Sequence, residues 1–139
     1  MIRVGGYPID TEPRPIKQWE RDLLLHMLSQ PFPGRDELLQ QAQHKLLVRT
    51  EIPDGTFSFF SDHDPPARTI DHAVPVSGYY DSPTGTHVQF LLFTTDNGHL
   101  SEIEIITIPD GQAIVELDPD SIQLQIETRS RSDMEAETL

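Results

Sequence analysis

The spacing of the apolar residues changes its period at about residue 45, and this change constrains the fold more than any other feature. In the first part, Ile16, Trp19, Leu23 and Met27 recur at three- and four-residue intervals, which predicts an amphipathic helix over residues 15–29. Pro31-Phe32-Pro33-Gly34 ends that helix, and a second, shorter helix is predicted over residues 35–44. Residues 15–44 are therefore expected to form two helices joined by a short turn.

After residue 45 the apolar residues alternate with polar ones, as in strands that have one buried face. The runs with this alternation are candidate strands over residues 46–52, 56–60, 73–80, 86–95, 99–108, 113–117 and 121–128. Helices followed by sequential strands predict an α+β fold, with two N-terminal helices packed on a mostly antiparallel sheet of about five to seven strands. We expect residues 1–13 to form an extended arm, residues 14–128 a single domain and residues 129–139 a mobile tail.

Short turn sequences join the candidate strands. Pro53-Asp54-Gly55 predicts a tight turn, because proline fixes φ and glycine accepts a positive φ. Asp96-Asn97-Gly98 predicts a hairpin with a type I′ turn, the type that Asn-Gly favours. The alternation slips at Ile105-Ile106, where we expect a β-bulge.

Charge is distributed unevenly along the chain, whose formal net charge is −13. Residues 1–49 carry seven Lys or Arg and six Asp or Glu, whereas residues 50–128 carry fourteen Asp or Glu and a single basic residue, Arg68. An acidic surface repels phosphate backbones, so we expect no nucleic-acid binding. The same surface attracts a basic protein partner, although acidity also serves solubility alone.

Several classes of protein are excluded by what the sequence lacks. It contains no cysteine, so disulfides, thiolate nucleophiles and cysteine-ligated zinc are impossible. The first ten residues lack the apolar core of a signal peptide, and the apolar runs fall far short of the roughly 20 residues that cross a bilayer. We therefore expect a cytoplasmic protein that does not bind membranes.

The stretch S-D-H-D-P-P-A-R-T-I-D-H, residues 61–72, gathers three aspartates and two histidines. A metal site here would combine Asp62, Asp64 and His72, because metals need carboxylates and imidazoles that converge on one point. The alternative is a polar surface loop, in which Arg68 pairs with Asp62, Asp64 or Asp71 and orders the segment. No spacing typical of a metal motif favours the first interpretation.

Further candidate residues lie on the strands. Glu102 and Glu104 share one face of their strand, as catalytic carboxylates do, but alternate with apolar residues and are expected to face water. Tyr79 and Tyr80 are neighbours and point opposite ways, so one of them is expected to meet a partner, and we assign this role to Tyr80. No nucleophile elbow or glycine-rich phosphate loop is present.

Two segments support a resemblance to known proteins. Residues 14–24, R-P-I-K-Q-W-E-R-D-L-L, give an arginine, a glutamate and a leucine-rich helix, and residues 96–105, D-N-G-H-L-S-E-I-E-I, give a hairpin that ends in a Glu-Ile-Glu-Ile strand. With these the chain resembles an uncharacterised family of small bacterial α+β proteins, immunity-protein-like in size and acidity. The resemblance covers residues 14–118 and implies no established activity. Ile106 and Thr107 stand where the family pattern has an aromatic residue.

The sequence thus predicts a non-enzymatic, acidic protein-binding domain, of which an immunity-type inhibitor of a basic partner is one form. The residues expected to bind the partner are Asp62, Asp64, Arg68, Asp71, Tyr80, Glu102 and Glu104. No catalytic residue and no cofactor are expected. The alternative is a metal-dependent or histidine-using enzyme centred on residues 61–72, and self-association through an edge strand is a third hypothesis.

Overall fold

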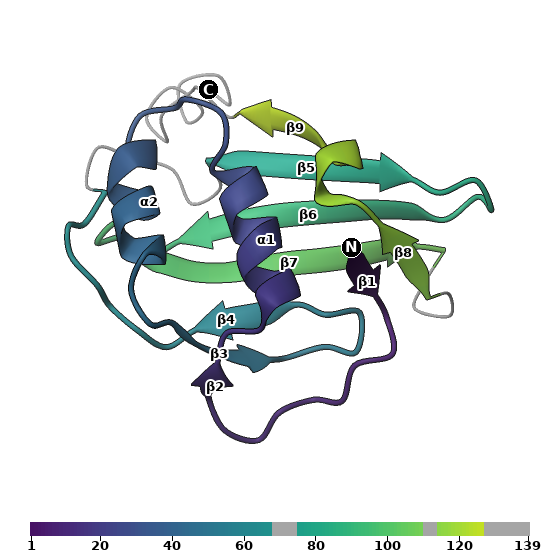
Figure 1. The fold of residues 1–139 in the computed structure, drawn as a ribbon, viewed down its shortest axis with the longest axis horizontal. Helices are drawn as coiled ribbons and strands as arrows, with labels where there is room; N and C mark the ends of the chain where they lie inside the picture. The colour runs from purple at the N-terminus through teal and green to yellow at the C-terminus, as the bar shows by residue number, and fades with distance from the viewer. Residues whose placement is uncertain (68–74, 110–113, 127–139) are drawn as a thin grey trace, which may run out of the picture.

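The computed structural model describes residues 1–67, 75–109 and 114–126, and every structural statement below refers to these residues. Its strands are β1 Ile2–Val4, β2 Arg14–Pro15, β3 Leu47–Thr50, β4 Phe57–Phe59, β5 Val76–Asp81, β6 His87–Thr94, β7 Leu100–Ile108, β8 Val115–Leu117 and β9 Gln123–Ile126. Seven of them form an antiparallel sheet in the order β2-β3-β4-β7-β6-β5-β9, and β1 pairs with β8 in a second sheet (Figure 1). The α+β class and the antiparallel sheet predicted from the sequence are confirmed.

The two helices are α1, Gln18–Met27, and α2, Arg35–Ala42, and a short 3₁₀ turn covers Pro119–Ser121. Helix α1 begins three residues later than the predicted Pro15, because Arg14–Pro15 form a strand against β3 and the Ile16 amide donates to the Leu46 carbonyl oxygen at 3.0 Å. Backbone pairing with the sheet edge therefore overrides the preference of proline for a first helical turn.

One hydrophobic cluster contains the buried residues of both helices and of the sheet. Helix α1 contributes Leu23, Leu24 and Met27, and α2 contributes Leu38, all with no exposed surface. In Figure 1 both helices lie in front of the strands. We call the side of the sheet that supplies core residues such as Phe57, Phe90 and Ile103 the inner face, and the side formed by the alternating residues the open face.

A buried ion pair joins the helical segment to the sheet edge. The guanidinium of Arg14 donates to both carboxylate oxygens of Glu20, each at 2.8 Å, and Glu20 is completely buried. Asp10 accepts bonds from Arg14 Nε at 2.7 Å and from the Thr50 amide at 2.9 Å. The Thr50 amide, together with Arg14, holds the pKa of Asp10 below its usual value. The arginine and glutamate of the opening motif are thus bonded to each other.

The hairpin between β6 and β7 differs from its predicted form. Asn97 has a negative φ, Gly98 has a φ of +84°, and the Gly98 amide donates to the Thr95 carbonyl oxygen at 2.9 Å. This is a type I turn followed by a left-handed glycine, so the prediction of a type I′ turn is wrong. The one register shift in the β6–β7 pair lies next to this turn, at Phe93/Thr94, and not at Ile105-Ile106 as predicted.

The N-terminal residues and the helix lengths complete the description. Residues 1–13, expected as an extended arm, contain β1, and the amides of Gly5, Tyr7 and Asp10 donate to carbonyl oxygens of residues 50–54. No helix within the described ranges is long and apolar enough to span a membrane. The segment expected as a mobile tail lies outside the described residues.

Candidate functional site

The open face of the large sheet presents rows of side chains that are set by the strand register. Arg49, Ser58, Glu102 and Phe93 form one row across β3, β4, β7 and β6. The rows beside it are Glu104, Leu91, Ser77 and Gln125, and then Ile106, Gln89, Tyr79 and Gln123. Because the inner face holds the core, this open face is where β5, β6, β7 and β9 can meet another molecule.

Three carboxylates gather at the β3–β4–β7 part of the open face, and we call Glu51, Glu102 and Glu104 the acidic group. Partial burial raises the pKa of Glu102 above its ordinary value, and the negative charges of Glu104 and Glu51 raise it further. Ionised Glu102 is therefore destabilised in the free protein. A nearby cation would offset the repulsion from Glu104 and Glu51.

Arg49 is the basic residue on this part of the open face. Its Nε donates to Glu51 Oε1 at 2.8 Å, and its guanidinium lies 4.6 Å from the centroid of the Phe60 ring. These contacts direct Arg49 toward Glu51 and Phe60, and within the described residues neither Glu102 nor Glu104 forms an ion pair. Two carboxylates of the acidic group are thus left without a basic partner in this part of the chain.

Exposed apolar side chains accompany the acidic group on the open face. Leu47, Phe60, Tyr79 and Ile108 are 43, 45, 38 and 50 % exposed, respectively. Leu91, Phe93 and Ile106 are half-buried between them. A surface that combines aromatic side chains with charges of one sign is typical of protein-binding sites.

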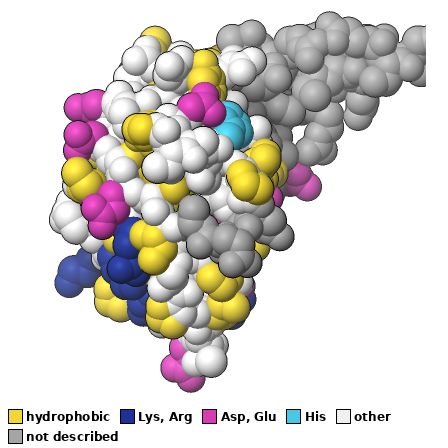
Figure 2. Space-filling model, turned by 90° about the vertical axis from the view of Figure 1, so that its right-hand side faces the viewer, with side chains coloured by type: hydrophobic (Ala, Val, Ile, Leu, Met, Phe, Trp, Pro, Cys, Tyr) yellow, Lys and Arg dark blue, Asp and Glu magenta, His cyan; other side chains and the backbone are white. Residues whose placement is uncertain are grey.

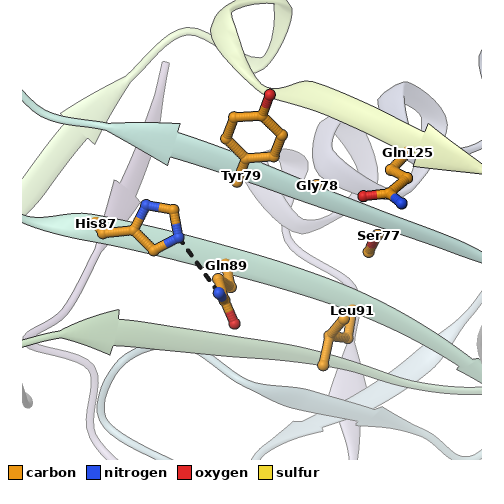
Figure 3. Close-up of a pocket in the computed structure, with 7 residues that line it drawn as sticks. All are labelled: Ser77, Gly78, Tyr79, His87, Gln89, Leu91 and Gln125. Atoms are coloured by element: carbon orange, nitrogen blue, oxygen red, sulfur yellow. Dashed lines mark hydrogen bonds between the residues drawn. The ribbon is translucent and has the colours of Figure 1, made fainter.

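A hollow of about 380 Å³ lies on the open face over β5, β6 and β9 (Figure 3). It is lined by Ser77, Gly78, Tyr79, His87, Gln89, Leu91 and Gln125. Asp81 bonds to Nδ1 of His87 at 2.6 Å, and Nε2 of His87 lies 3.3 Å from Nε2 of Gln89. The Tyr79 hydroxyl donates to Gln123 Oε1 at 2.7 Å. These bonds fix the orientation of the polar side chains and of the tyrosine ring before any ligand binds.

The described part of the predicted loop, residues 61–67, lies against the β6–β7 hairpin. The Ala67 amide donates to the Gly98 carbonyl oxygen at 2.8 Å. The buried Gln41 side chain donates to the carbonyl oxygens of Pro65 and Gly98 and accepts a bond from the Leu100 amide at 3.0 Å. The loop and the hairpin are therefore adjacent.

The predicted residues of this loop are solvent-facing. Asp62 and Asp64 are exposed, and Asp64 Oδ1 lies 3.8 Å from Nε2 of His99. The ring of His63 stacks on that of His44, with centroids 4.3 Å apart. Asp62 and Asp64 thus reach the surface near the hairpin, but on the loop and not among the rows of the open face.

The two adjacent tyrosines lie on opposite faces of β5. Tyr80, to which we assigned a role in partner binding, is half-buried and packs against the core cluster on the inner face. Tyr79 lies on the open face beside Gln89 and lines the hollow. The alternation of side chains along a strand places the two tyrosines on opposite faces. Which of them is exposed depends on the face on which the helices lie.

Arg68, Asp71 and His72 lie outside the described residues, so the structure does not place them. The structure therefore gives no distances for the predicted metal ligands Asp62, Asp64 and His72, or for the predicted ion pair of Arg68. Within residues 1–67, 75–109 and 114–126, no group of three or more His, Asp or Glu side chains is arranged to hold a metal ion.

Basic side chains gather away from the open face. Arg3 and Lys17 both lie over the ring of Tyr7, at 4.6 and 5.4 Å from its centroid. Figure 2 shows the Lys and Arg side chains of one side of the molecule in a single group, with acidic side chains spread over the rest of the view.

The acidic group, the exposed apolar residues and the hollow were not all predictable. Comparison of the chain with protein-family models, with curated proteins and with solved structures finds no match. Function is therefore inferred from the surface chemistry. Glu51 and the Asp81–His87 pair were missed, and the role in partner binding was assigned to Tyr80 and not to Tyr79. The strand register that brings these residues together is a tertiary property.

Proposed function

We propose that the protein is a non-enzymatic, acidic protein-binding domain whose open face binds a basic protein. The observation that carries the proposal is the acidic group, where partial burial and two neighbouring carboxylates raise the pKa of Glu102. A positive charge from a partner would relieve the repulsion among the three carboxylates, and this gain in free energy would favour binding. The exposed Phe60 and Tyr79 supply the aromatic contacts that commonly anchor such interfaces.

Binding is favoured over catalysis by the arrangement of the polar groups. Glu102 and Glu104 do not line the hollow, and an acid–base pair works best in a sheltered site. His87 is bonded to Asp81 and Gln89, and no hydroxyl group in the described residues is bonded to its ring. The charges and aromatic residues instead lie on a broad face that suits a macromolecular partner.

An immunity-type inhibitor is one form of this function, because small acidic α+β proteins often act in that role. Such a protein binds a basic toxin and blocks it, which requires an acidic and exposed face but no catalytic group. The acidity of residues 50–128, where Arg68 is the single basic residue, fits this role.

Affinity capture from an extract of the native host would test the proposal. The bait proteins would be the wild type, a Glu102→Gln/Glu104→Gln variant and a control Asp118→Asn/Asp120→Asn variant. The control removes two negative charges from exposed positions outside the open face, so both variants change the net charge equally. Each capture would be made at about 0.1 M and about 1 M salt, where the screening length falls from about 10 to about 3 Å.

The expected result is one basic protein that the wild type and the control retain at low salt. The Glu102→Gln/Glu104→Gln variant should lose it, and high salt should weaken its retention by the wild type. Equal retention by both double variants would show that the acidic group is not the binding surface. Retention of a protein without excess positive charge would contradict the proposed chemistry.

A further inference from the structure

We infer that the hollow over β5, β6 and β9 receives an arginine side chain of the basic partner. The inference rests on the proposed function and deepens it, because it names the group that the open face recognises. The hollow has the volume of a small-ligand site, at the lower end of the usual range of about 300–1,000 Å³. One long side chain projecting from a protein surface is an occupant of suitable size.

The hollow exists because a small residue lies between larger ones. Ser77 is paired with Leu91 on one side and with Gln125 on the other. In the next row, Tyr79 is paired with Gln89. Figure 3 shows the tyrosine ring and the two glutamine side chains standing around the short serine. A side chain that enters here would lie on Ser77, with the tyrosine ring on one side and Leu91 on the other.

The lining offers one aromatic face and several hydrogen-bond acceptors. The bond from the Tyr79 hydroxyl to Gln123 holds the ring in place, and a fixed aromatic face attracts a cation. Nε2 of Gln89 lies 3.3 Å from Nε2 of His87, so the amide oxygen of Gln89 remains available to accept a hydrogen bond. The Ser77 hydroxyl and the Gln125 amide oxygen are further acceptors.

Carboxylates flank the hollow at both ends. Asp81 is bonded to His87 at one end, and Glu104 is paired with Leu91 at the other. The strands β5, β6, β7 and β9 contain no Lys or Arg. An anion would be repelled at this position, and a neutral aliphatic group would leave the acceptors unpaired.

Arginine fits these surroundings better than lysine. Its planar guanidinium can stack on the Tyr79 ring while its five N–H groups reach several acceptors at once. A lysine ammonium is a compact, strongly hydrated charge that cannot do both. The aliphatic part of the arginine would contact Leu91, which lines the same hollow.

The test is a titration of the full ¹⁵N-labelled chain with N-acetyl-arginine amide, followed by amide NMR signals. The controls are N-acetyl-citrulline amide, which has nearly the same shape without charge, and N-acetyl-lysine amide. We expect saturable shifts at Ser77, Tyr79 and Leu91, with a dissociation constant on the order of 1–10 mM for a probe of this size. Lysine should bind more weakly, and citrulline should cause no saturable shift.

Variants of two exposed residues, Tyr79 in the hollow and Leu25 on α1, make the test specific. Tyr79→Ala should weaken binding of the arginine probe about fivefold or more, because it removes the aromatic face. Tyr79→Phe keeps that face and should retain most of the binding. Leu25→Ala removes an exposed apolar side chain of α1 that is not part of the hollow and should have no effect.

Three results would overturn the inference: no saturable shifts at the hollow, binding of citrulline or lysine as strong as that of arginine, or equal effects of Tyr79→Ala and Leu25→Ala. The titration contains no partner protein, so its failure is distinct from failure of the proposed function. If the titration shows no arginine binding, the affinity capture through the acidic group can still succeed. If arginine binds but the capture is not selective, the proposed function is wrong.

Discussion

Removal of the Glu20 carboxylate should destabilise the fold strongly. Glu20 is completely buried on α1 and accepts three bonds of 2.8 Å, two from the Arg14 guanidinium and one from the Lys17 amide. In Glu20→Ala these bonds disappear together. The guanidinium of Arg14, whose side chain is 20 % exposed, would keep Asp10 as its only described carboxylate partner.

The expected loss is about 3 kcal/mol of unfolding free energy. Breaking a buried ion pair by removing one partner costs about 3–5 kcal/mol, and the lower value applies because Arg14 keeps Asp10 and some contact with water. A chain of this length has an unfolding entropy of roughly 0.3 kcal/mol/K, so the midpoint of thermal unfolding should fall by about 10 °C. Replacement of both partners, as in Arg14→Met/Glu20→Leu, should recover much of this loss, because no buried charge then remains unpaired.

Urea unfolding followed by tryptophan fluorescence would measure the effect. The chain has a single tryptophan, Trp19, whose ring lies 5.0 Å from that of Tyr7 and 5.9 Å from that of Phe57. The matched control is Glu12→Ala, which removes the same carboxylate from an exposed position and should change stability by less than about 0.5 kcal/mol. Loss of less than about 1 kcal/mol in Glu20→Ala, with an unchanged urea slope, would refute the role assigned to the ion pair.

Three further predictions concern the open face and the loop beside it. Glu102→Gln should raise the thermal midpoint at neutral pH, because the raised pKa of Glu102 makes its ionised form destabilising. The difference in midpoint between variant and wild type should vanish as the pH falls below 4.5, the ordinary pKa of this group. A difference that does not depend on pH would contradict the prediction. Gly98→Ala should destabilise the protein by about 1–3 kcal/mol in urea unfolding. The added Cβ would lie 2.6 Å from the Ala67 backbone, and the residue has a φ of +84° that alanine rarely adopts. Gly85→Ala is the control and should cost less, because Gly85 has a φ of +92° but open space around it. Elemental analysis of protein purified without a chelator should show no stoichiometric metal, and one bound zinc, manganese or iron would favour the enzyme hypothesis centred on residues 61–72.

Elements with a clear period were predictable, and their ends were not. The stripe of Leu23 and Met27 located α1, and the alternation of Val88, Phe90 and Leu92 located β6. The start of α1 was missed because the pairing of β2 with β3 depends on residues far apart in the sequence. The same limit applies to the site: Glu102 and Glu104 were predicted to share a face, but Glu51 reaches them only through the fold of β3 against β4.

The wrong prediction at Ile105-Ile106 identifies a signal for the open face. Two adjacent apolar residues in an alternating strand were interpreted as a bulge, yet β7 continues in register with Ile105 on the inner face and Ile106 on the open face. Thr107 takes the next inner position and donates its hydroxyl to Asp54 at 2.9 Å. A single exposed apolar residue is common on a protein surface, whereas a contiguous apolar patch marks an interaction site. Ile106 adjoins Leu91 and Phe93 on the open face, so we propose that it belongs to the binding surface rather than to a defect in the strand.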